Sequence, residues 1–130
     1  MGFYIRIWGV SMTNLNLTYS TSTSSSGIHS RAITSTRGHH IIVDDHGGEE
    51  WGAGELFLSG IGACAVNMIG RIASTEDIPL SWIQAEVDAY RDPDKAEGEI
   101  SVFDRIDVNI RMWGLDKAKG QEMVEKWKRR

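Results

Sequence analysis

An apolar stretch in the middle of the chain constrains the fold most. Residues 54–75 carry only two charges, Glu55 and Arg71, and are apolar on nearly every side, over a length that favours a helix over a strand. A helix of this kind is buried in the middle of a fold. Its interior glycines each cost about 1 kcal/mol of helix stability relative to Ala. We therefore expect a partner helix to pack closely against it, from this chain or from a second subunit.

Composition narrows the class of protein. A chain of 130 residues is one domain's worth, and 14 Lys and Arg against 18 Asp and Glu give a net charge of −4. This acidic balance disfavours nucleic-acid binding. The single cysteine, Cys64, excludes an intramolecular disulfide and a cysteine-based zinc site, so we expect a reducing cytoplasm.

Targeting and membrane signals are weak. Residues 1–12 are interpreted as an N-terminal extension. We expect no signal peptide there, because Arg6 interrupts the apolar run and no small-residue cleavage site follows. The longest apolar run, residues 56–69, is predicted to be too short to span a bilayer. We expect no membrane partner.

Strand patterns precede the central helix. Residues 13–23 alternate between polar and apolar side chains, which predicts a strand with one buried face. The Ser/Thr tract at 20–26 predicts a hairpin turn. Residues 28–34 and 39–44 are the next two strand candidates, and a glycine-rich loop at 45–52 leads to the helix.

A hairpin and a helix follow the central segment. Residues 82–90 alternate, residues 92–98 form a turn, and the returning strand carries Ile106, Val108, Ile110 and Met112 on its inner face. Asp116 is the predicted N-cap of a C-terminal helix. The order βββ-α-ββ-α is an α+β pattern. We expect the C-terminal helix to be interrupted, because no glycine cap follows it.

Cys64 is the main candidate for chemistry. The plain interpretation is a buried thiol that only fills space. A reactive thiol instead needs partial exposure and a nearby cation that favours the thiolate. Arg71 lies on the same helix face, about 10 Å away by helix rise, and Arg31 or Arg37 could reach it from the N-terminal strands. Glu55 suits the positive end of the helix and lies on the face opposite Cys64.

Two polar clusters are weaker candidates. A metal site is conceivable among residues 39–46, but neighbouring strand residues point to opposite faces, so His39 and His40 cannot bind one ion together. We expect no metal and no cofactor, and a solvated strand edge and loop instead. The lysines and arginines of residues 117–130 are interleaved with Asp116, Glu122 and Glu125, which favours a solvated helix face over a nucleic-acid patch.

Two segments carry a resemblance to a known family. They are GHHIIVDD at 38–45, followed by a Gly-Gly loop, and GELFLSGIGAC at 54–64. With these, residues 13–130 resemble the OsmC/Ohr family of osmotically inducible and organic hydroperoxide resistance proteins, and the glutamate nine residues before the cysteine is similar to a divergent OsmC-like subgroup.

The resemblance implies a fold and a reaction. It implies an OsmC-like α+β domain over residues 13–130 and an intertwined homodimer with the central helices buried at its middle. It implies thiol-dependent peroxidase activity on organic hydroperoxides, with Cys64 as the peroxidatic thiol. It also implies that Arg31 activates the thiol, that Glu55 holds the arginine, and that a thiol reductant restores the enzyme.

Three departures from the family leave a second function open. The chain has no second cysteine and lacks the usual final strand, Gly54 stands where Ohr-type members have glutamate, and Ala53 stands at the position of the usual proline. An external thiol would have to resolve the sulfenic acid. The alternative is a non-catalytic dimer of this fold, or a module that binds a small apolar ligand. A binding role for the basic C-terminal helix is a more distant third.

Overall fold

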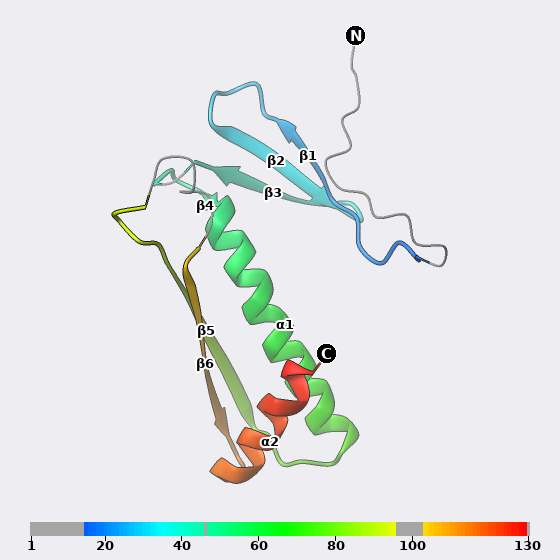
Figure 1. Ribbon diagram of the computed structural model, residues 1–130. Coiled ribbons are helices and arrows are strands. Elements are labelled where there is room, and N and C mark those ends of the chain that lie inside the picture. The colour runs from blue at the N-terminus through cyan, green and yellow to red at the C-terminus, as the bar shows by residue number, and fades with distance from the viewer. Residues whose placement is uncertain (1–14, 46, 96–102, 130) are drawn as a thin grey trace. The chain divides into compact units, whose positions relative to one another are not determined.

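The computed structural model describes residues 15–45, 47–95 and 103–129. The residues group by their mutual contacts into two compact units, residues 1–43 and residues 44–130. The elements run as strands, a long helix, two strands and a second helix, which confirms the predicted α+β order (Figure 1). A short extra strand precedes the long helix. The predicted extension at 1–12 lies outside the described residues.

The first unit is a small sheet of short strands. It contains β1 (Ser22–Ser25), β2 (Arg31–Thr36) and β3 (His39–Asp44), which are adjacent in that order. β1 and β2 are antiparallel, with Ser22 opposite Ser35. β3 has the predicted bounds, and β2 begins three residues later than predicted.

The predicted start of this sheet is wrong. Residues 15–21 lie before β1 and form no strand, and the Ser/Thr tract predicted as a turn contains β1 itself. Hydroxyl side chains support the strand by cross-strand contact, as between Thr23 Oγ1 and Thr34 Oγ1 at 2.7 Å. The turn falls later, where Gly27 has φ +86° and the Ser26 hydroxyl donates to the Arg31 carbonyl oxygen at 2.9 Å.

The second unit is built on the long helix. It contains β4 (Trp51–Gly52), α1 (Ala53–Thr75), β5 (Trp82–Tyr90), β6 (Arg105–Trp113) and α2 (Lys117–Lys128). β5 and β6 form an antiparallel hairpin, with Trp82 opposite Trp113, which confirms the predicted hairpin. The Asp116 carboxylate accepts the Lys119 N–H at 2.8 Å, so this residue is the predicted N-cap of α2.

The core of this unit lies at the C-terminal half of α1. The inner residues of β5 face α1, because the strand alternates between exposed and half-buried positions. Residues from both helices form the buried cluster, which consists of Ile69, Ile72, Ala73 and Met123. Partly buried side chains of both strands and of α2 pack around this cluster.

The N-terminal half of α1 is largely exposed in this chain. Buried α1 residues begin at Ala65, and Phe57 is 55% exposed. A Cβ added at Gly60 or Gly70 would meet nothing within 4 Å, whereas one at Gly62 would lie 3.5 Å from Val87 Cγ2. Burial on every side by a second subunit therefore stays a prediction.

The helix is also longer than its apolar run. At 23 residues, α1 is long and apolar enough to cross a membrane by length and composition alone, with 22% of the tested window buried. The prediction of no membrane span concerned the shorter apolar run at 56–69, whereas this test takes the whole helix. Core helices of soluble proteins pass the same test, so the feature is weak evidence for a membrane.

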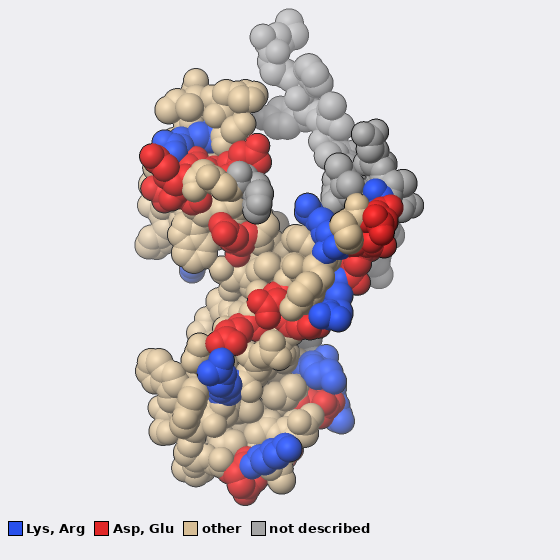
Figure 2. Space-filling view, turned by 90° about the vertical axis from the view of Figure 1, so that its left-hand side faces the viewer, with Lys and Arg blue, Asp and Glu red and all other residues tan. Residues whose placement is uncertain are grey.

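Several charged side chains on the second unit form ion pairs. Figure 2 shows acidic and basic residues interleaved on the face that it presents. On β5 and β6, Arg111 pairs with Glu86 at 2.6 Å. On α2, Lys126 bridges Glu76 at 2.6 Å and Glu122 at 2.9 Å. Pairing of this kind fits the predicted solvated face of α2.

The Glu122 carboxylate gives an expected pH dependence. Hydrogen bonds from Lys119 and Lys126 lower its pKa from 4.5 to about 2. The folded state therefore gains stability that is fully present above pH 4.5 and is lost as the pH falls through about 2. We expect Glu122→Gln to lower the urea midpoint slightly at pH 7, because the pair is exposed, and by less at pH 2, where about half of the carboxylate is protonated. An equal decrease at both pH values in urea titrations would contradict this.

Candidate functional site

The first turn of α1 is held by Glu55. The N-cap is Gly52, which has no side chain to cap the helix, and its N–H donates to Glu55 Oε2 at 2.7 Å. A carboxylate at this end also meets the positive end of the helix dipole. Glu55 therefore stabilises the start of α1, as its position at the positive end of the helix dipole predicted.

Cys64 lies in the middle of α1 and is exposed. Within a single chain the thiol is therefore not buried, contrary to the plain interpretation. Glu55 precedes it by nine residues, which is half a turn short of a whole number of helical turns, so the two side chains leave opposite faces. They do not meet within one copy of α1. An added Cβ at Gly60, one turn before Cys64, would face open space.

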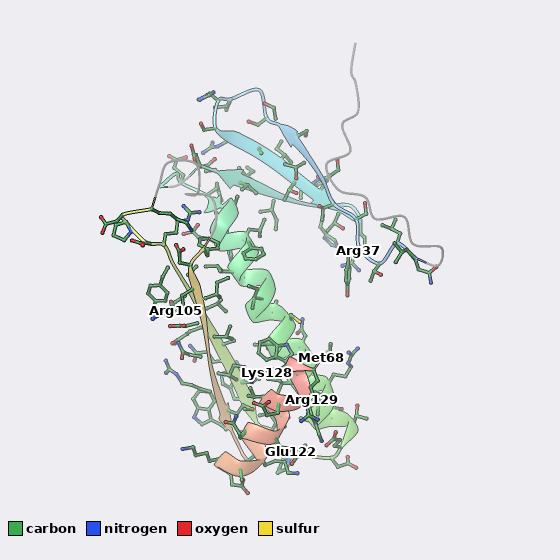
Figure 3. All side chains as sticks on the ribbon, viewed as in Figure 1. Arg37, Met68, Arg105, Glu122, Lys128 and Arg129 are labelled. Atoms are coloured by element: carbon green, nitrogen blue, oxygen red, sulfur yellow. The ribbon has the colours of Figure 1, made fainter. Side chains whose placement is uncertain are left out.

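Two of the arginines considered as activators of the thiol, Arg31 and Arg37, lie in the first unit. Arg31 is half-buried and begins β2, where its carbonyl oxygen accepts from the Ser26 N–H at 3.1 Å. Arg37 forms the tight turn between β2 and β3 with Gly38, and both have positive φ angles, 48° and 81° (Figure 3). Cys64 and Glu55 belong to the second unit.

A third arginine lies on α1 itself. The Arg71 guanidinium, through Nη2, donates to Met68 Sδ at 2.7 Å. The side chain thus folds back along the helix toward its N-terminus, a direction that sequence spacing alone does not reveal.

The polar cluster at 39–46 holds a loop. Asp44 is 8% exposed, and its Oδ2 accepts the N–H groups of Glu49 and Glu50, each at 3.1 Å. His40 Nδ1 instead lies 2.8 Å from Ser35 Oγ, and His46 lies outside the described residues. Among residues 15–45, 47–95 and 103–129, no three His, Cys, Asp or Glu side chains gather in a way that could hold a metal ion. Asp44 therefore shapes the approach to α1.

Comparison with known proteins defines the class. The family model for OsmC-like proteins matches residues 46–130, which include β4, α1, Cys64, the hairpin and α2. The chain belongs to the OsmC-like protein family, as the motif around Cys64 predicted. Family membership associates it with redox and stress-response proteins.

Solved structures share the fold. An OsmC-like protein from Mycoplasma pneumoniae is 16% identical, with a TM-score of 0.77 over 89% of this chain and 84% of its own. The organic hydroperoxide resistance protein OsmC of Legionella pneumophila is 22% identical, with a TM-score of 0.59 over 84% and 82%. OhrB of Bacillus subtilis, also an organic hydroperoxide resistance protein, is 19% identical, with a TM-score of 0.57 over 84% and 83%. No curated protein sequence matches the chain.

Proposed function

We propose that this protein is a thiol-dependent peroxidase that reduces organic hydroperoxides through Cys64. The observation that carries the proposal is an exposed thiol at the middle of the long helix of an OsmC-like chain. Two of the structural neighbours are named for organic hydroperoxide resistance. An exposed thiol can meet a peroxide, whereas a buried one is inert.

The reaction balances with an external thiol. The Cys64 thiolate attacks one peroxide oxygen, the O–O bond breaks, and the substrate leaves as an alcohol after taking a proton. Cys64 becomes a sulfenic acid. One external thiol then forms a mixed disulfide with Cys64 and releases water, and a second thiol restores Cys64 and leaves as a disulfide. The chain needs two external thiols because Cys64 is its only cysteine. A reducing cytoplasm supplies them.

Arg31 and Glu55 have supporting roles in the proposal. The resemblance to the OsmC/Ohr family gives Arg31 the role of the cation that stabilises the thiolate and the developing charge on the leaving oxygen. Glu55 acts through Arg31 by fixing the orientation of its guanidinium. Because Glu55 and Cys64 leave opposite faces of α1, a second copy of the chain supplies one of the two to each site.

Lysine substitutions distinguish the proposed role of Arg31 from that of Arg37. We expect Arg31→Lys to lower kcat/KM for an organic hydroperoxide about 10- to 100-fold, because lysine keeps the charge and loses the planar fork of donors. Arg37→Lys is the matched control and leaves kcat/KM unchanged. Initial rates of peroxide loss measure both. Equal effects of the two substitutions would contradict a role for Arg31.

The proposed assembly is a homodimer. The N-terminal half of α1 is apolar yet exposed, with Phe57 at 55% exposure, and an apolar face of this kind is covered in a functional assembly. We expect light scattering at micromolar concentration to give about twice the chain mass of 14.5 kDa. A mass of one chain at every concentration would contradict the dimer.

One observation favours the non-catalytic alternative. A pocket of about 450 Å³ lies between α1 and β5, lined largely by small and apolar side chains such as Leu58, Val66 and Val87. A small apolar ligand would suit it. In that case the protein binds such a ligand and leaves peroxide intact.

A turnover assay tests the proposal. The full chain is mixed with cumene hydroperoxide and either dithiothreitol or a dihydrolipoyl donor, and peroxide loss is followed above the rate without protein. The proposal expects many turnovers per chain and a lower rate with hydrogen peroxide. If no peroxide is consumed with either donor, the proposal is wrong and the binding module is favoured.

A further inference from the structure

The face of α1 that carries Cys64 also carries a cation. Counting by helical turns from Cys64, Met68 comes one turn later and Arg71 two turns later, so the three side chains lie along one stripe. Cys64 and Arg71 are exposed, and Met68 is half-buried. The stripe lies within one helix of the second unit and depends on no other part of the chain.

The Arg71 side chain points back along this stripe. Nη2 of Arg71 donates to Met68 Sδ at 2.7 Å, which draws the guanidinium toward the turn that contains Cys64. The Cβ atoms of residues four apart on a helix are about 5–6 Å from each other. The guanidinium therefore contacts the side chain one turn after Cys64, although the Arg71 backbone lies about two turns from Cys64.

Among the described residues, no carboxylate forms an ion pair with the Arg71 guanidinium. The ion pairs of the second unit involve Lys95, Arg105, Arg111 and lysines of α2, and none includes Arg71. Met68 Sδ is a weak, uncharged acceptor. The positive charge of Arg71 is therefore not neutralised by an acidic partner and remains available to a nearby anion.

From this geometry we propose that Arg71 is a positioning residue for the peroxidatic thiol, held toward Cys64 by Met68. The inference rests on the proposed function of Cys64 and adds a cation from the same helix. The Arg71 charge stabilises the Cys64 thiolate and draws anionic reagents to it. Because this is a Coulombic effect across partly solvated space, it changes the reaction rate of the Cys64 thiolate roughly 3- to 30-fold. The effect weakens as the salt concentration rises.

Alkylation of Cys64 tests the inference without peroxide. Cys64 is the only cysteine, so thiol labelling of the full chain reports on this residue alone. Neutral iodoacetamide measures the thiolate, and negatively charged iodoacetate also measures the local positive charge. We expect Arg71→Gln to slow iodoacetamide about 3- to 10-fold and to reduce the iodoacetate-to-iodoacetamide rate ratio by a similar factor.

Three further variants separate charge from structure. We expect Arg71→Lys to keep the iodoacetamide rate and the iodoacetate-to-iodoacetamide rate ratio at least halfway between Arg71→Gln and the original chain, because lysine keeps the charge. Met68→Leu keeps the volume but loses the sulfur acceptor, and we expect it to lower the rate ratio by less than Arg71→Gln does. Arg105→Gln removes a charge from β6, where Arg105 pairs with Asp107 at 3.1 Å, and leaves both quantities unchanged.

The outcomes distinguish this inference from the proposed function. An unchanged rate ratio in Arg71→Gln, or a thiol that iodoacetamide does not reach in the folded chain, overturns the role of Arg71. A reduced ratio with rescue by lysine supports it. If that ratio falls while the chain consumes no peroxide, the positioning of the thiol stands and the peroxidase assignment fails.

Discussion

Cys64→Ser is expected to abolish hydroperoxide consumption, with a loss of roughly 10³-fold or more in kcat/KM. A serine hydroxyl is not ionised near neutral pH and does not form a sulfenic acid equivalent, so neither the attack nor the recycling by thiols can proceed. The fold should be unaffected, since the replaced side chain is exposed. Its free energy of unfolding should stay within about 0.5 kcal/mol of the original.

A neighbouring position supplies the matched control. Ala63→Ser adds a hydroxyl one residue away on the same helix, at an exposed position. We expect this variant to keep the original rate of peroxide loss with dithiothreitol. Comparable activity of Cys64→Ser and the unchanged chain would show that the peroxide is consumed elsewhere.

Gly114→Ala is expected to be the most destabilising single methyl addition in the second unit. Gly114 follows β6 with φ +93°, and an added Cβ would lie 2.2 Å from the Pro79 carbonyl oxygen and 2.9 Å from the Ser81 nitrogen. Both neighbours are backbone atoms in the connection between α1 and β5. The left-handed conformation costs a non-glycine residue roughly 1–2 kcal/mol and the overlap about 1–3 kcal/mol more.

The clash also breaks a specific contact. The Ser81 N–H donates to the Trp113 carbonyl oxygen at 2.9 Å, next to Gly114. We expect urea unfolding to show a loss of about 3 kcal/mol, or failure to fold. Gly70→Ala is the control, because its added Cβ meets nothing within 4 Å and helix propensity favours alanine by about 1 kcal/mol. Equal stability of the two variants would contradict the described packing.

The second unit was largely predictable because its patterns are strong. Strict alternation marks β5 and β6, Asp116 marks the start of α2, and the long apolar run marks α1. The first unit was less predictable. Leu15, Leu17 and Tyr19 alternate with polar residues but lie outside any strand and are at least 71% exposed. Alternation without a neighbouring strand to pair with does not form a strand.

The candidate site was only partly predictable. The motif around Cys64 predicted the family. A helix that is apolar on every side does not reveal which of its faces is covered, so the exposure of the Cys64 thiol was not predictable. The contact from Glu55 to Gly52 follows from general capping rules. The contact from Arg71 to Met68 depends on side-chain conformation, which spacing does not specify.

Trapping the oxidised thiol tests the central claim most directly. The full chain is treated with one equivalent of cumene hydroperoxide without reductant, and dimedone, which reacts with sulfenic acids, is added before intact-mass and peptide analysis. The account predicts one dimedone adduct per chain on the peptide that contains Cys64, one equivalent of alcohol released, and no adduct in Cys64→Ser. Peroxide left intact with Cys64 unmodified would contradict it.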